Sequence, residues 1–175
     1  MRTLSGATRL AFLAFFSSHI PITLLVDGQA FLPQSLYPDI VKDVLRWYTA
    51  TFADDLMSAP YDVWFRSVVF CELFFQLPFF VYAVYTLWTP MNANGGQGGW
   101  FRPLCLIYGS HTATTLVPIL ATIATDPVST FYQKIALFGF YLPYLLFPLW
   151  LVYIAVANEN VFGGEADRME KRKSS

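Results

Sequence analysis

Four long apolar stretches constrain this chain more than any other feature, because each is long enough to cross a bilayer. They run from about Ala7 to Val26, Trp64 to Trp88, Phe101 to Ala124 and Ile135 to Ala157. A membrane-spanning helix needs about 20 predominantly apolar residues. Each stretch also carries proline, hydroxyl or ionisable residues, which is typical of helices that pack together. The sequence therefore predicts an all-α fold, a four-helix transmembrane bundle.

The composition agrees with a membrane protein. Only 13% of the 175 residues are charged and 55% are hydrophobic, whereas a soluble domain carries about 25% charged residues. The net charge is −1 and no basic tract runs through the body, so we expect no nucleic-acid partner. Cys71 and Cys105 each lie in an apolar stretch, so we expect no disulfide. No cleavage pattern follows the first stretch, so we expect it to be a retained helix rather than a signal peptide.

A shorter helix is expected between the first two spans. Residues 38–48 have apolar side chains at 40, 41, 44, 45 and 48, which is the spacing of one helix face. We expect this short amphipathic helix to lie on the lumenal membrane surface or to cap the bundle. Residues 1–160 then form one transmembrane domain, and residues 161–175 form a basic cytosolic tail.

The distribution of basic residues predicts the orientation. With four spans, seven basic residues lie on the side of the two termini and four lie on the other. Loops rich in lysine and arginine stay in the cytosol, so both termini are expected there. Lys171 and Lys173 match a dilysine signal for retrieval to the endoplasmic reticulum, which coat proteins would read. The alternative is an ordinary basic flank after the last span.

Glu72 is the most informative polar residue, because it lies about 12 Å into the second span at about 1.5 Å per residue. A charged side chain near the bilayer centre costs about 2.5–3.5 kcal/mol, so such a residue is a functional candidate by default. His19, Thr23 and Asp27 follow at intervals of four in the first span. If these helices pack together, Asp27 and Glu72 form a coupled pair that shares a proton.

The remaining polar side chains could line the same cavity or could simply join the helices by hydrogen bonds. They are Gln76, Tyr108, His111, Thr112, Thr115, Tyr141 and Tyr144. Two separated histidines and two isolated cysteines make no metal-ligand set, and no phosphate-binding loop or nucleophile–base motif occurs. We therefore expect no metal, no cofactor and no catalytic residue.

Several blocks resemble one family nearly residue for residue. They are Ser18–Asp27, Leu36–Pro38, Phe70–Phe80, Ile107–Leu120 and Tyr141–Pro148. The chain resembles the sigma-2 receptor family, part of the EXPERA group with the emopamil-binding sterol isomerases, and we expect a fungal member. Gly28 and Phe140 depart from the mammalian pattern, which puts the pocket shape in doubt.

The resemblance implies a four-helix bundle in the endoplasmic reticulum membrane, with a lumenal-side cavity that opens laterally to lipid. Its two key acids fall on Asp27 and Glu72. Its further ligand contacts fall on Tyr48, Asp54, Gln76, Tyr108, Thr115, Tyr141 and Tyr144. The expected function is non-enzymatic binding of sterols or cationic amphiphilic molecules in intracellular sterol handling. The expected partners are this ligand, membrane lipid, coat proteins and a second copy of the chain.

Two other functions stay open. A sterol double-bond isomerase needs an acid and a base, and Glu72, Asp27, His19 or His111 could in principle serve. A fungal branch of the family is named for assisting the targeting of mitochondrial proteins from the endoplasmic reticulum surface. That role would depend on the lumenal loop and the tail rather than on the cavity.

Overall fold

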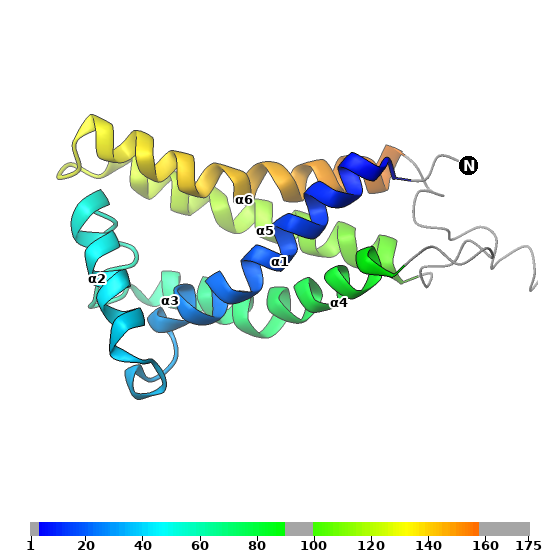
Figure 1. Cartoon of the computed structure of the whole chain (residues 1–175). Helices are drawn as coiled ribbons and strands as arrows, with labels where there is room; N and C mark the ends of the chain where they lie inside the picture. The colour runs from blue at the N-terminus through cyan, green and yellow to red at the C-terminus, as the bar shows by residue number, and fades with distance from the viewer. Residues whose placement is uncertain (1–3, 90–99, 158–175) are drawn as a thin grey trace, which may run out of the picture.

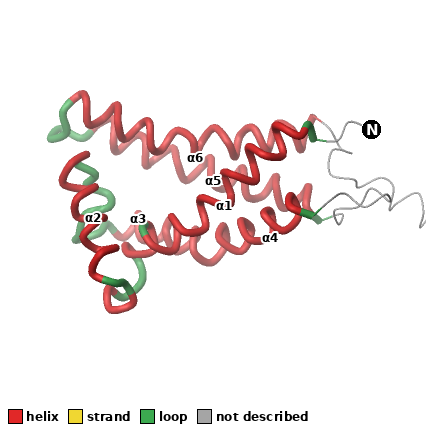
Figure 2. Tube along the Cα trace, viewed as in Figure 1, coloured by secondary structure: helices red, strands yellow, loops and turns green. Residues whose placement is uncertain are grey.

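The computed structural model describes residues 4–89 and 100–157, and these form helices joined by turns, with no strand in those two ranges (Figures 1 and 2). Four spans of 25 to 27 residues are long and apolar enough to cross a membrane. This confirms the predicted all-α transmembrane bundle. The elements of the spans are α1 (Gly6–Leu25) with η1 (Asp27–Ala30), α3 (Val63–Cys71) with η3 (Glu72–Gln76) and α4 (Leu77–Trp88), α5 (Phe101–Thr125), and α6 (Phe131–Ala157).

The expected amphipathic helix is present as α2 (Asp39–Phe52), and it crosses one end of the bundle (Figure 1). A short turn, η2 (Gln34–Leu36), precedes it. At this end α1 finishes, α3 begins, α5 finishes and α6 begins. Lys171, Lys173 and the expected tail at 161–175 lie outside the described residues, so the retrieval signal stays a prediction.

Aromatic side chains fill the half of the bundle that lies away from α2. Phe12, Phe16, Phe80 and Phe101 are almost fully buried there. Phe15 stacks on Phe147 of α6 with ring centroids 4.5 Å apart. Such pairs add about 0.5–1.5 kcal/mol beyond the burial of their area. Toward α2 the spans enclose a cavity that carries most of the polar side chains of the bundle.

The second span contains one widened turn at its centre. Pro78 has no N–H to donate to the carbonyl four residues earlier, and its ring would crowd that carbonyl in a regular helix. The turn over Glu72–Gln76 is instead a π-helix, in which the N–H of Leu77 donates to the carbonyl of Glu72. Single π-turns are frequent at functional sites. Here the turn carries Glu72 and Gln76, both of which line the cavity described below.

The fourth span begins at Phe131 rather than at the expected Ile135. The Thr130 hydroxyl accepts from the Gln133 N–H at 3.3 Å, and the Gln133 side-chain oxygen accepts from the Thr130 N–H at 3.0 Å. These two bonds form a capping box, which satisfies free donors at a helix start. The Thr-x-x-Gln spacing is a local signal that apolar run length alone does not register.

Arg9 ties α1 to the end of α4, because its guanidinium donates to the carbonyls of Leu87 at 2.6 Å and of Trp88 and Thr89 at 3.1 Å. We expect Arg9→Ala to lower the free energy of unfolding by about 1–2 kcal/mol, since charge-assisted bonds to unpaired helix carbonyls are lost. Thermal unfolding in detergent measures this. Arg46→Ala is the control, because its guanidinium pairs with Asp43 at an exposed site. Equal stability of the two variants would contradict the capping role of Arg9.

Candidate functional site

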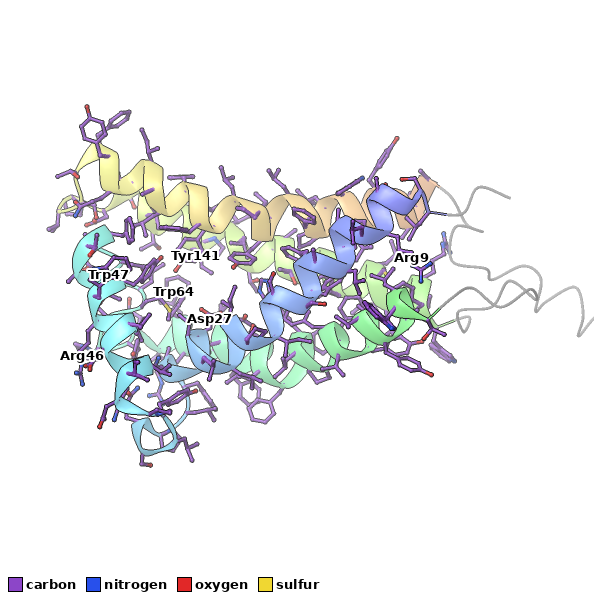
Figure 3. The ribbon with its side chains drawn as sticks, viewed as in Figure 1. Arg9, Asp27, Arg46, Trp47, Trp64 and Tyr141 are labelled. Atoms are coloured by element: carbon purple, nitrogen blue, oxygen red, sulfur yellow. The ribbon has the colours of Figure 1, made fainter. Side chains whose placement is uncertain are left out.

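A cavity of about 60 Å³ lies between the four spans in the half of the bundle next to α2. Figure 3 shows Asp27 and Tyr141 beside this space, on the first and fourth spans. One wall is apolar and the other polar. The lining residues are His19, Asp27, Phe65, Val68, Val69, Glu72, Gln76, Thr112, Thr115, Leu116, Ile119, Tyr141 and Tyr144.

Two carboxyl groups meet in the cavity. Asp27 follows α1 in η1, Glu72 opens the π-turn, and both carboxyl groups line the cavity. The Thr23 hydroxyl donates to Glu72 Oε1 at 2.6 Å, and His19 Nε2 lies 3.7 Å from the same oxygen. Two carboxyl groups, a threonine hydroxyl and an imidazole therefore gather on this side of the cavity.

The polar wall continues onto α5. The Thr112 hydroxyl donates to Gln76 Oε1 at 3.1 Å, and both side chains are buried. The Thr115 hydroxyl donates to the Thr112 carbonyl at 2.9 Å. These bonds fix the orientation of the Gln76 amide, so the polar wall is rigid before any ligand enters.

A second space of about 140 Å³ adjoins the first and shares Asp27, Tyr141 and Tyr144 with it. It lies between α1, α2 and α6, and its other walls are Ile22, Val26, Tyr48, Met57 and Phe140. Sites for drug-sized ligands are about 300–1,000 Å³. Each of the two spaces is smaller than that range.

Asp54 lies at the α2 end of the site, where it bonds two of the tyrosines that line it. The preceding Ala53 ends α2 in the left-handed region at φ 53°, and Asp54 turns inward with only 1% of its surface exposed. Its Oδ2 accepts from the hydroxyls of Tyr48 and Tyr141, each at 2.9 Å. Burial raises the pKa of this carboxyl, and the bonds from the two tyrosines offset part of that increase. Asp54 thus joins α2 to α6.

Gly28 lies next to Asp27 at a closely packed position. A Cβ at this position would lie 2.6 Å from the Tyr37 hydroxyl and 3.0 Å from the Thr23 carbonyl oxygen. Tyr37 thus occupies the space that a larger side chain would take.

The structure brings most of the predicted contacts together. Asp27, Glu72, Gln76, Thr115, Tyr141 and Tyr144 line the main cavity, Tyr48 lines the adjoining space, and Asp54 holds Tyr48 and Tyr141. Tyr108 lies outside both spaces, because its ring stacks on Phe79 with centroids 4.4 Å apart. Sequence reasoning missed the apolar wall. Helical spacing could have identified this wall, because Phe65 and Val69 lie seven and three residues before Glu72 and therefore on the same helix face.

Comparison with known proteins gives the family. The model of the family described as EXPERA (EXPanded EBP superfamily) matches residues 40–155, which is most of the chain. The chain belongs to this family. The match runs from α2 to α6 and therefore covers three spans and the helix that closes the cavity.

Individual relatives narrow the family further. Sigma intracellular receptor 2 from Homo sapiens is 42% identical over 149 residues, covering 79% of this chain and 81% of the relative. The protein of the same name from Xenopus tropicalis is 40% identical over 172 residues, covering 93% and 92%. Efficient mitochondria targeting-associated protein 19 from Saccharomyces cerevisiae is 33% identical over 156 residues, covering 82% and 94%. The predicted sigma-2 receptor family is confirmed, whereas the expected fungal origin stays a prediction.

Proposed function

We propose that this EXPERA protein binds a sterol or a cationic amphiphilic molecule between its four spans, as a binding protein rather than an enzyme. The carboxyl pair of Asp27 and Glu72 carries the proposal, because both acidic side chains line a largely apolar cavity. No lysine or arginine is among the described residues that line this cavity. A hydrophobic ligand with one amine or hydroxyl supplies the missing partner.

Binding of a radiolabelled cationic amphiphile and of a sterol to purified protein tests this function. We expect Glu72→Gln and Asp27→Asn each to weaken binding of the amine by about tenfold or more, or about 1.4 kcal/mol. The sterol carries no charge, so it should lose less affinity in the same variants. Asp55→Asn is the matched control, because its side chain is exposed and lies away from the cavity lining.

The outcomes separate the alternatives. If neither ligand binds the folded wild-type protein, the cavity proposal is wrong. If both ligands bind and the two cavity variants behave like Asp55→Asn, the carboxyl pair is not the recognition element. Loss of the amine alone identifies charge recognition as the source of its affinity.

We further propose that the protein resides in the endoplasmic reticulum membrane with both termini in the cytosol. The seven-to-four division of basic residues and the spacing of Lys171 and Lys173 support this. Changing both lysines to serine should move a tagged protein to later secretory compartments in fluorescence images. Changing Arg168 and Arg172 to serine is the control, because it removes equal charge. Equal redistribution of both variants would contradict a receptor-read signal.

One observation favours each remaining function. The similarity to the yeast protein covers 94% of that protein, and its name concerns efficient mitochondrial targeting. If targeting requires this chain and survives Glu72→Gln with Asp27→Asn, that role is independent of the cavity.

His19 beside Glu72 offers a second proton-transfer group for an isomerase. Rescue of a sterol-isomerase-deficient strain would support that reaction.

A further inference from the structure

One edge of α2 is apolar and exposed, although the helix is well anchored without it. Ile40, Val44 and Trp47 are 73%, 54% and 63% exposed. Their spacing of four and three places them on one side of the helix. Leu45, by contrast, is buried, and Tyr48 is bonded to Asp54. The contacts that hold α2 on the bundle therefore do not use the exposed edge.

The charged residues of α2 lie on a different side. Asp39 pairs with Lys42 at 2.7 Å, and Asp43 pairs with Arg46 at 2.6 Å. Figure 3 shows Arg46 on the outer side of α2, away from the spans. The helix thus has three sectors: one packed on the protein, one charged, and one apolar and exposed, where Trp47 contacts Phe52 of the same helix. A strongly charged face beside an apolar face is typical of helices that lie in a membrane interface.

The level of α2 along the bundle matches a membrane boundary. Val63 begins the second span and is 81% exposed, while Phe131 and Tyr132 begin the fourth and are 72% and 83% exposed. Exposed aromatic residues at the ends of spans mark the interfacial region of a bilayer. Since α2 crosses the bundle at this end (Figure 1), its apolar edge meets lipid at the same depth.

We propose that α2 is an interfacial helix whose Ile40, Val44 and Trp47 insert into the adjacent leaflet. The partner of this surface is the boundary between lipid headgroups and acyl chains. Tyr48 on the same helix reaches Asp54, which also holds Tyr141 of the cavity wall. The bilayer thereby holds the helix that closes one end of the cavity. The insertion itself does not depend on which ligand the cavity binds.

Depth-dependent fluorescence quenching tests this proposal on the full chain in phosphatidylcholine vesicles. The difference between wild type and Trp47→Phe isolates the emission of Trp47 without altering the other tryptophans. We expect lipids brominated near the ester group to quench this emission by roughly half, and lipids brominated near the chain end to quench it less. Aqueous iodide should have little effect. The same subtraction with Trp88→Phe is the control, because Trp88 ends a span and is 73% exposed.

Each other outcome overturns the insertion. If iodide quenches Trp47 and brominated lipid does not, the apolar edge of α2 is exposed to water. Protection from both quenchers, with Trp88 quenched by lipid as expected, shows that protein covers the edge, as in a second copy of this chain. Circular dichroism of Trp47→Phe confirms that the helices are intact in the subtraction.

Discussion

Replacing Gly109 with alanine should lower the free energy of unfolding by about 2–3 kcal/mol, as expected for overpacking at a closely packed site. A Cβ at this position would lie 2.5 Å from Val152 Cγ2 and 2.8 Å from the Pro148 carbonyl oxygen. The Val152 side chain can rotate, but the carbonyl belongs to the α6 backbone and cannot move without shifting the helix. Small residues allow such close approach of membrane helices. Unfolding by heat or by denaturing detergent measures the loss.

Gly139→Ala is the matched control, because this glycine also lies inside a span and its added Cβ would meet nothing within 4 Å. Alanine is the better helix former by about 1 kcal/mol, so this variant should be as stable as the wild type or more stable. If Gly109→Ala matches it, α5 and α6 do not approach as closely as described. The contrast separates helix propensity from packing, since both variants make the same chemical change.

The spans were predictable because run length and polarity report directly on the cost of placing polar groups in lipid. All four apolar runs are helical in the structure, and the residues with helical spacing at 40–48 lie in α2. The π-turn was not predicted. Pro78 indicated an irregularity, but a proline permits a kink, a break or a widened turn. The choice among these depends on how Glu72 and Gln76 pack against α1 and α5.

Some residues of the candidate site could be predicted from the sequence and others could not. Glu72 and Asp27 stand out because a buried carboxyl is costly, and a costly residue in lipid needs a partner wherever it lies. Tyr108 lacks such a signal. A tyrosine on a membrane helix can bond a ligand or stack in a core, and the neighbouring rings of Phe79 and Phe16 draw it into the core. The resemblance gave Asp54 as a ligand contact, whereas in the structure its carboxyl accepts from the hydroxyls of Tyr48 and Tyr141 and lines neither space.

Removing the Asp54 carboxyl should be the second large perturbation, with a loss of about 3 kcal/mol for Asp54→Ala. The hydroxyls of Tyr48 and Tyr141 and the N–H of Met57 all donate to this side chain. Each buried donor left without an acceptor costs about 1–3 kcal/mol. Asp55→Ala is the control, because it removes an exposed carboxyl from the neighbouring position. Unfolding in detergent measures both, and equal stability would contradict the role of Asp54 as the link between α2 and α6.

Asp54→Asn isolates the titration of the same group, because the amide keeps an acceptor oxygen but cannot ionise. Burial raises the pKa of Asp54 in the folded protein, whereas an unfolded aspartate titrates near about 3.9. The folded state therefore holds the proton more tightly. Its contribution to stability is full below that pH and is lost as pH rises through the folded pKa. Between the unfolded pKa and the folded pKa, the free energy of unfolding of the wild type should therefore fall relative to that of Asp54→Asn. Above the folded pKa, the difference between the two proteins should no longer change with pH. A difference that stays constant with pH would contradict this, because it would show that the Tyr48 and Tyr141 bonds offset the whole cost of burying the charge and leave the folded pKa equal to the unfolded one.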